Sequence, residues 1–236
     1  MHKCNRVFAF GCSMTKYSWP TWADIYGSDF PEYYNYGSSG AGNVFISNQI
    51  VEQSLRHNIG ECDKVLIMWS TETRIDSYYN GWRTPGNIYT QGEYPKEVQN
   101  LFSPRGFLIR DLAIIKTTEK FLRSLGCEYF IGVMQKFTTQ DEDISELYDI
   151  ENLSYPSLLE SVGGKWPEIN CTNWGNSADM HPDPIKHYKF LEFAGLNPTE
   201  SMRTFMENWQ QKVDKYETHQ EVDWSDDIQG SEMDRL

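Results

Sequence analysis

The most constraining feature of this chain is a continuous, largely apolar run at residues 64–69, with the sequence Lys-Val-Leu-Ile-Met-Trp. A strand that is apolar along its length has both faces covered, which is typical of parallel strands between two layers of helices. Shorter apolar runs at residues 6–10 and 129–133 have the same character, and a fourth short strand is predicted at residues 32–36. These runs predict a mainly parallel central sheet.

Helical patterns separate the predicted strands. Apolar residues recur at helical spacing within residues 107–125, and Gly126 supplies a stop after them. Further helices are predicted at residues 19–26, 44–55, 144–148, 184–195 and 200–216. Strands that alternate with helices indicate an α/β fold, here a three-layer α/β/α sandwich.

The chain has 236 residues, a length typical of one domain. We expect a single domain over residues 1–216, with loop-rich excursions at residues 76–105 and 138–175. Residues 217–236 are polar and acidic with few apolar side chains, so we expect a flexible tail there.

The charge pattern argues against several kinds of partner. The chain carries 34 acidic and 21 basic residues, a net charge of −13, without the block of Lys or Arg that phosphate binding needs. We therefore expect no nucleic-acid partner. No apolar run approaches the roughly 20 residues of a membrane span, and the N-terminal apolar run is too short for a signal peptide. The expected location is cytoplasmic and without membrane contact, although a virion component would show the same pattern.

The cysteines and histidines indicate neither a disulfide framework nor a metal site. The 5 cysteines are widely spaced and form no Cys-x-x-Cys pair, so we expect reduced thiols. His181 and His187 have no convincing third ligand in the sequence, so no metal and no cofactor are expected. The sequence leaves the oligomeric state open.

Two motifs of small residues follow the first two predicted strands. Ser13 comes directly after the first strand, where Gly11 permits a sharp turn and backbone N–H groups suit a developing oxyanion. Gly40 lies in the Gly/Ser-rich loop 37–43, which ends at Asn43 and is not followed by the Gly-Lys-Ser/Thr of a phosphate loop. The alternative is structural for both motifs, with Ser13 in an ordinary turn or cap and Asn43 capping the next helix.

Polar residues also mark two later positions. Glu72 and Arg74 follow the strongest strand, either as a surface ion pair or as the lining of a pocket. Asp179 and His181 lie near the C-terminal third, and a His beside an Asp is the general-base half of a hydrolytic triad. The alternative for this pair is a surface loop. His187 lies near the start of a predicted helix and is interpreted as a packing or capping residue.

Together the four motifs resemble the SGNH (GDSL) hydrolase family. Residues 11–15, Gly-Cys-Ser-Met-Thr, are similar to its nucleophile motif, with Cys12 where Asp is usual. Residues 39–40 are similar to its second motif, and residues 179–182 to its last. Gly-Cys-Ser-x-Thr followed by Trp-Pro is similar to a subgroup common among phage-encoded and bacterial members. The resemblance covers residues 5–195 and implies the SGNH-hydrolase fold, a sandwich with a flavodoxin-like parallel sheet.

The resemblance also implies roles for individual residues. Ser13 would be the nucleophile, His181 the general base, and Asp179 the residue that orients the imidazole. The backbone N–H groups of Ser13 and Gly40 would hold the oxyanion.

Two positions depart from the family pattern. Glu72 stands where the family has an Asn that donates to the oxyanion, and an ionised carboxylate only accepts hydrogen bonds. Arg74, Asn43 or a backbone N–H are the candidate substitutes. The link between Asp179 and His181 is also one residue shorter than the usual Asp-x-x-His.

The function expected from these residues is a serine esterase that works through an acyl-enzyme. Its substrate would be an acyl or acetyl ester of a small polar molecule or a carbohydrate. Aromatic residues in the first excursion would stack on sugar rings or, as readily, pack against the body of the protein: Tyr78, Tyr79, Trp82, Tyr89 and Tyr94. The alternatives are a catalytically inactive binding or virion-assembly protein, suggested by Glu72 and the acidic tail, and an acyltransferase.

Overall fold

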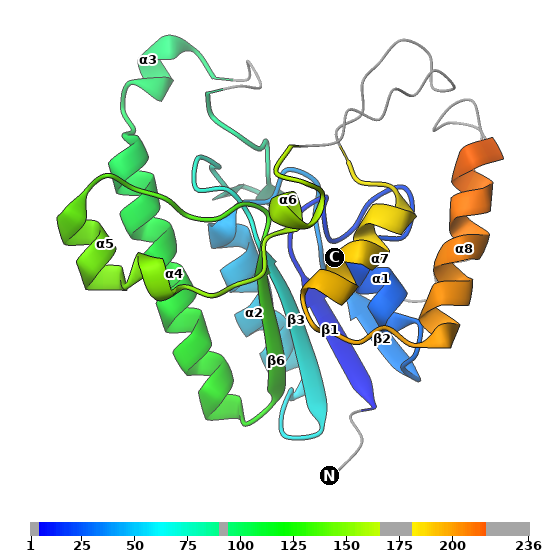
Figure 1. Cartoon of the computed structure of the whole chain (residues 1–236). Helices are drawn as coiled ribbons and strands as arrows, with labels where there is room; N and C mark the ends of the chain where they lie inside the picture. Colours follow the sequence, from blue (N-terminus) through cyan, green and yellow to red (C-terminus); the bar gives the residue numbers. More distant parts are fainter. Residues whose placement is uncertain (1–4, 90–93, 166–180, 216–236) are drawn as a thin grey trace.

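The computed structural model describes residues 5–89, 94–165 and 181–215 (Figure 1). At its centre is a four-stranded parallel sheet in the order β2-β1-β3-β6, formed by Glu32–Asn35, Arg6–Phe10, Asp63–Trp69 and Glu128–Val133. All four predicted strands are confirmed. In a parallel sheet the carboxyl ends of all strands lie at one edge, where ligands bind in folds of this class.

Helices cover both faces of this sheet (Figure 1). One layer contains α2 (Asn43–His57) and α4 (Pro104–Leu125), which pack against each other. The other layer contains α1 (Trp22–Gly27), α7 (Pro184–Phe193) and α8 (Glu200–Lys215), which contact one another. The predicted three-layer α/β/α sandwich with a parallel sheet is therefore confirmed.

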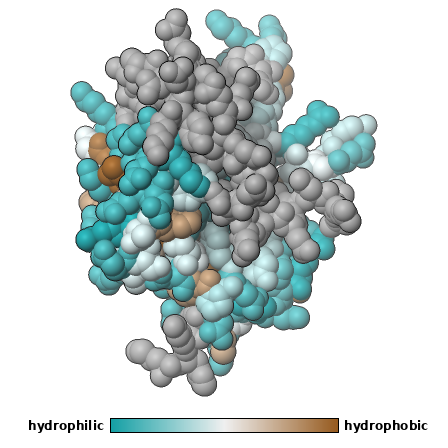
Figure 2. All heavy atoms as spheres, turned by 90° about the vertical axis from the view of Figure 1, so that its right-hand side faces the viewer, coloured by the Kyte–Doolittle hydropathy of each residue, from teal (hydrophilic) through white to brown (hydrophobic). Residues whose placement is uncertain are grey.

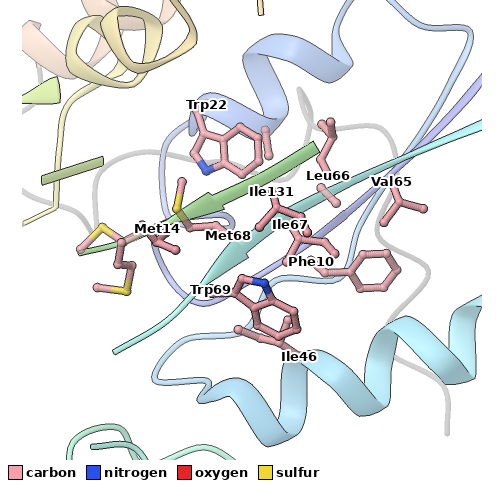
Figure 3. Packing of buried hydrophobic residues seen from close by; sticks show 14 of the residues in the cluster. Phe10, Met14, Trp22, Ile46, Val65, Leu66, Ile67, Met68, Trp69 and Ile131 are labelled. Carbon is pink, nitrogen blue, oxygen red and sulfur yellow. The ribbon is translucent and has the colours of Figure 1, made fainter. Parts of the chain in front are cut away.

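The hydrophobic core has two halves, one on each face of the sheet. Figure 3 shows Trp22 of α1 on one side of the strands, and Trp69 together with Ile46 of α2 on the other. Trp22 packs edge-on against Phe190 of α7, with ring centroids 5.5 Å apart. Every side chain from Val65 to Trp69 is fully buried, as expected for a strand covered on both faces.

Local capping decides where the helices begin. α1 begins at Trp22 rather than at residue 19, because Thr21 and Asp24 form a capping box in which the Thr21 N–H donates to Asp24 at 2.8 Å. α4 begins at Pro104, three residues earlier than predicted, because the Ser103 hydroxyl caps the helix and proline suits the first helical position.

The two excursions contain short elements of their own. The first holds a hairpin and one helical turn, β4 (Ser77–Tyr78), β5 (Trp82–Arg83) and α3 (Lys96–Gln99). The described part of the second holds α5 (Glu142–Tyr148), η1 (Ile150–Asn152) and α6 (Leu158–Ser161). The second excursion also contacts the carboxyl end of the outer strand, since the Val133 N–H donates to the Pro156 carbonyl at 3.0 Å.

α8 is the outermost helix on its side of the molecule. It buries Met202, Met206 and Trp209, and the surface on this side is mostly hydrophilic where it is coloured (Figure 2). Within the described ranges, no helix is long and apolar enough to cross a membrane. The acidic tail predicted at residues 217–236 lies outside the described residues.

Candidate active site

Three of the four sequence motifs follow strands of the sheet. Ser13 follows β1, Gly40 follows β2, and Arg74 follows β3, so the topology brings all three to the carboxyl edge of the sheet. A hydrogen bond from the Ser38 N–H to the Gly11 carbonyl, 3.1 Å long, ties the second motif to the first. The sheet thus assembles residues that are far apart in the chain.

Ser13 lies in a tight turn that requires glycine at its start. The Cys12 carbonyl accepts the N–H groups of Thr15 and Lys16 at 2.8 and 3.1 Å, which closes the turn around Ser13. A Cβ atom at Gly11 would lie 2.0 Å from the Thr15 hydroxyl oxygen, so the turn requires glycine there. Ser13 is 6% exposed, and its N–H donates to no acceptor within the described part of the chain. That N–H is available to a ligand.

Gly40 has a similar role in the second motif. Its φ is +71°, a left-handed conformation that favours glycine, and a Cβ there would lie 2.1 Å from the Thr84 carbonyl oxygen. The Thr84 hydroxyl donates to the Ser39 carbonyl at 2.7 Å, which holds the first excursion against this loop. The Gly40 N–H, like that of Ser13, donates to no acceptor among the residues described.

His181 is brought to the first motif by aromatic stacking. Its ring stacks on Tyr17, with centroids 3.8 Å apart and planes 14° from parallel. The neighbouring Pro182 carbonyl accepts the Trp19 indole N–H at 2.7 Å. Both contacts join the C-terminal motif to the segment that directly follows Ser13. Asp179, its predicted partner, lies outside the described residues.

The other two polar residues of the C-terminal motif have structural surroundings. The Asp183 carboxylate caps α7, accepting the Lys186 N–H at 2.9 Å and contacting its ammonium group at 2.6 Å. His187 is 1% exposed, and burial, with smaller effects of His181 and Lys186, lowers its pKa to about 3. A buried imidazole with this pKa is neutral and weakly basic, which agrees with the interpretation of His187 as a packing residue.

Arg74 reaches across the carboxyl edge of the sheet. Its Nη1 donates to the Ala41 carbonyl at 2.9 Å, and its Nη2 lies 3.7 Å from the Met134 sulfur. The same sulfur accepts the Cys12 thiol at 3.2 Å. The guanidinium group is therefore held between the Gly40 loop and a methionine that contacts the residue before Ser13.

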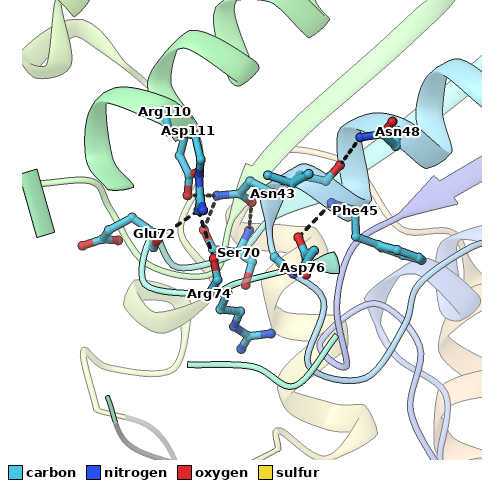
Figure 4. A network of polar contacts seen from close by, with 11 residues as sticks. Asn43, Phe45, Asn48, Ser70, Glu72, Arg74, Asp76, Arg110 and Asp111 are labelled. Carbon is cyan, nitrogen blue, oxygen red and sulfur yellow. Dashed lines mark hydrogen bonds and ion pairs between the residues drawn. The ribbon is translucent and has the colours of Figure 1, made fainter. Parts of the chain in front are cut away.

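Asn43 and Glu72 do not present hydrogen-bond donors to this place. Asn43 is fully buried, and its amide donates to Asp111 at 2.8 Å and to the Ser70 carbonyl at 3.2 Å, which uses both of its hydrogens. Asn43 is also the first residue of α2 and not its cap, since Gly42 occupies the cap position. Glu72 accepts a hydrogen bond from Arg110 through its backbone carbonyl, and its carboxylate extends away from Asn43 and Arg74 (Figure 4).

Sequence reasoning missed Asp111 and Arg110, which lie directly behind these groups. A signal was present, because Asp111 occupies a core-facing position of the amphipathic helix α4, between the buried Leu108 and Leu112. A charged residue on an apolar stripe indicates a buried polar network. No sequence signal pointed to the stacking of Tyr17.

A separate cavity of about 710 Å³ opens beside the end of β6, between the second excursion and the end of α7. Its lining includes Phe137, Tyr155 and Phe193, and it contains neither Ser13 nor His181. Within the described ranges, no group of three His, Cys, Asp or Glu side chains is arranged to hold a metal ion.

No protein-family model and no curated protein matches this chain. Similar solved structures include a lipolytic G-D-S-L family protein from Desulfitobacterium hafniense DCB-2, with 15% identity and a TM-score of 0.46 over 81% of this chain and 98% of that one. A GDSL-like lipase from Bacteroides thetaiotaomicron VPI-5482 has 13% identity and a TM-score of 0.45, over 86% and 88% of the two chains. A member of the lipolytic G-D-S-L family from Veillonella parvula DSM 2008 has 13% identity and a TM-score of 0.44, over 83% and 98%. At these low identities and TM-scores, the likeness assigns neither a family nor an activity to this chain.

Proposed function

We propose that this chain is a serine ester hydrolase of the SGNH type, with Ser13 as nucleophile and His181 as general base. The observation that supports this most is the stacking of His181 on Tyr17, four residues after Ser13. It joins an imidazole to the turn that carries Ser13, whose backbone N–H has no acceptor among the described residues. The Gly40 N–H, at the same sheet edge, likewise has no acceptor in the described ranges and supplies a second donor.

The proposed reaction proceeds in two steps. Ser13 Oγ attacks the ester carbonyl while His181 takes its proton, and the carbonyl oxygen becomes an oxyanion held by the N–H groups of Ser13 and Gly40. His181 then gives the proton to the departing alkoxide, which leaves an acyl group on Ser13. Water, deprotonated by His181, attacks the acyl group, and His181 returns the proton to Ser13 Oγ as the acyl–oxygen bond breaks and the acid is released. Asp179 orients the imidazole and stabilises its charged form.

Arg74 takes the place of the missing asparagine donor in this proposal. The Asn43 amide hydrogens are both used, and the Glu72 carboxylate extends away, whereas the Arg74 guanidinium group lies between the Gly40 loop and Met134. A positive charge at this place would stabilise the oxyanion. One oxyanion donor is worth about 10²- to 10³-fold in kcat in other serine hydrolases.

The proposed substrate is an acyl or acetyl ester of a small polar molecule or a carbohydrate. Thr84 joins the first excursion to the loop of Gly40, and the nearby hairpin displays Tyr78 and Tyr79, each 70% exposed. Exposed aromatic faces stack on sugar rings. Trp82 instead packs edge-on against Phe45 and fixes the hairpin to the body of the protein.

Labelling with a fluorophosphonate probe tests this proposal. We expect covalent attachment that mass spectrometry locates on Ser13, no labelling of Ser13→Ala, and slow labelling of His181→Ala, because the base no longer activates the hydroxyl. Wild-type protein that stays unlabelled under conditions that label a serine esterase would contradict the proposal and favour a binding or assembly role.

A further inference from the structure

We propose that Asp111 is a positioning residue that holds Arg74 in place for the reaction, acting through the backbone of the turn after β3. This inference rests on the proposed function. Asp111 lies on α4 and is fully buried. Two sets of hydrogen bonds lead from its carboxylate to the turn (Figure 4).

The first set fixes the start of the turn. One carboxylate oxygen of Asp111 accepts the Asn43 amide at 2.8 Å. The other atoms of that amide pair with Ser70, whose N–H donates to the Asn43 oxygen at 2.8 Å and whose carbonyl accepts its nitrogen at 3.2 Å. Because both backbone groups of Ser70 are bonded to one side chain, the chain leaves β3 in a fixed direction.

The second set fixes the rest of the turn. The other carboxylate oxygen of Asp111 contacts the Arg110 guanidinium group. Arg110 Nη2 in turn donates to two backbone carbonyls, that of Glu72 at 3.1 Å and that of Arg74 at 3.0 Å. The backbone of Arg74 is thus held from behind, while its side chain reaches Ala41 and Met134 in front.

Burial of the Asp111 carboxylate is opposed by its two hydrogen-bond partners. Burial raises the pKa of Asp111 to about 6, against the opposing effects of Arg110 and Asn43, and Glu72 adds a smaller raising effect. Asp76, whose own pKa is raised by burial, also lies near Arg110 and Arg74. Both oxygens of this carboxylate accept a hydrogen bond, one from Asn43 and one from Arg110. An asparagine has only one acceptor oxygen, so Asp111→Asn breaks one of the two sets.

The experiment compares Asp111→Asn with a matched control, Asp63→Asn, at pH 8. Asp63 is also a buried aspartate paired with an arginine, Arg6, through two contacts of 2.8 Å, but it lies at the amino end of β3. For Asp111→Asn we expect a kcat lowered about 10- to 100-fold, an unchanged KM and a lower melting temperature. For Asp63→Asn we expect a lower melting temperature with wild-type kcat, so the loss of kcat separates the two variants.

A double-mutant cycle with Arg74→Ala tests whether Asp111 acts through Arg74. If it does, Asp111→Asn has no further effect on kcat or on the rate of fluorophosphonate labelling in the Arg74→Ala background. Wild-type kcat in Asp111→Asn, or full multiplication of the two effects, would overturn the inference while labelled wild-type protein still supports the esterase. Wild-type protein that resists labelling would overturn both.

Discussion

Replacing Gly40 with alanine should damage both the fold and the proposed reaction. The new Cβ would lie 2.1 Å from the Thr84 carbonyl oxygen, and Cβ contacts below 3.0 Å are essentially never seen. The carbonyl has little freedom to retreat, because the Thr84 hydroxyl is bonded to Ser39 and the following Gly86 is paired with Ile75. The Gly40 loop must therefore move, and its N–H with it.

The size of the effect follows from two separate costs. The left-handed conformation costs a non-glycine residue roughly 1–2 kcal/mol, and relief of the overlap adds about 1–3 kcal/mol. At about 2–4 °C per kcal/mol for a chain of this size, the melting temperature should fall by roughly 4–20 °C. Displacement of one oxyanion donor by about 1 Å should lower kcat by about 10²-fold or more.

Gly195→Ala is the matched control for this prediction. Its φ of +70° is nearly that of Gly40, but no atom lies within 4 Å of the Cβ it would gain. We expect only the conformational cost, a fall of roughly 2–8 °C, and wild-type kcat. Ester hydrolysis and thermal unfolding, measured on both variants, separate the two costs. Equal kcat values in Gly40→Ala and Gly195→Ala would refute the assignment of the Gly40 N–H to the oxyanion.

Three further predictions concern the acidic residues. Asp179→Asn should lower kcat by as much as about 10⁴-fold because His181 loses its orienting partner. Asp183→Asn should leave kcat unchanged because asparagine also caps a helix. The opposite pattern in steady-state kinetics would assign Asp183 to the triad in place of Asp179. The pKa of Asp111 is raised to about 6 in the fold, so between pH 4 and pH 6 the folded protein keeps a proton that the unfolded chain has lost. The unfolding free energy of wild type, relative to that of Asp111→Asn, should therefore fall by up to about 3 kcal/mol from pH 4 to pH 6 and stay level above pH 6. Denaturant titrations that show a pH-independent difference between the two proteins would contradict this. Removal of residues 217–236 should leave the melting temperature unchanged, and a large fall would show that the tail packs on the domain.

The central sheet was the part of the fold that could best be predicted from the sequence. An apolar run such as residues 64–69 is typical of a strand covered on both faces, and the order of strands and helices then indicates the layers. Helix starts were less accessible because they depend on single side-chain contacts, such as the capping box of Thr21 and Asp24. The pairing of the second excursion with β6 could not be predicted, because it consists of an isolated bridge between Val133 and Ser157 and leaves no strand pattern in the sequence.

The candidate site could be predicted from the sequence where a residue's position in the chain determines its place in the fold. Ser13 and Gly40 follow strands, so their place at the carboxyl edge follows from the topology alone. The roles of Asn43 and Arg74 depend on which hydrogen bonds are already occupied, and that information lies in Asp111 and Arg110 on a distant helix. Sequence spacing cannot report such long-range pairing.

The most direct test of the central claim is the hydrolysis of p-nitrophenyl acetate by wild-type protein and Ser13→Ala, measured in parallel. The account predicts turnover by the wild type, none above background by Ser13→Ala, and the same melting temperature for both, because the Ser13 hydroxyl forms no hydrogen bond with the described residues. Equal turnover by the two proteins would show that Ser13 is not the nucleophile and would contradict the account.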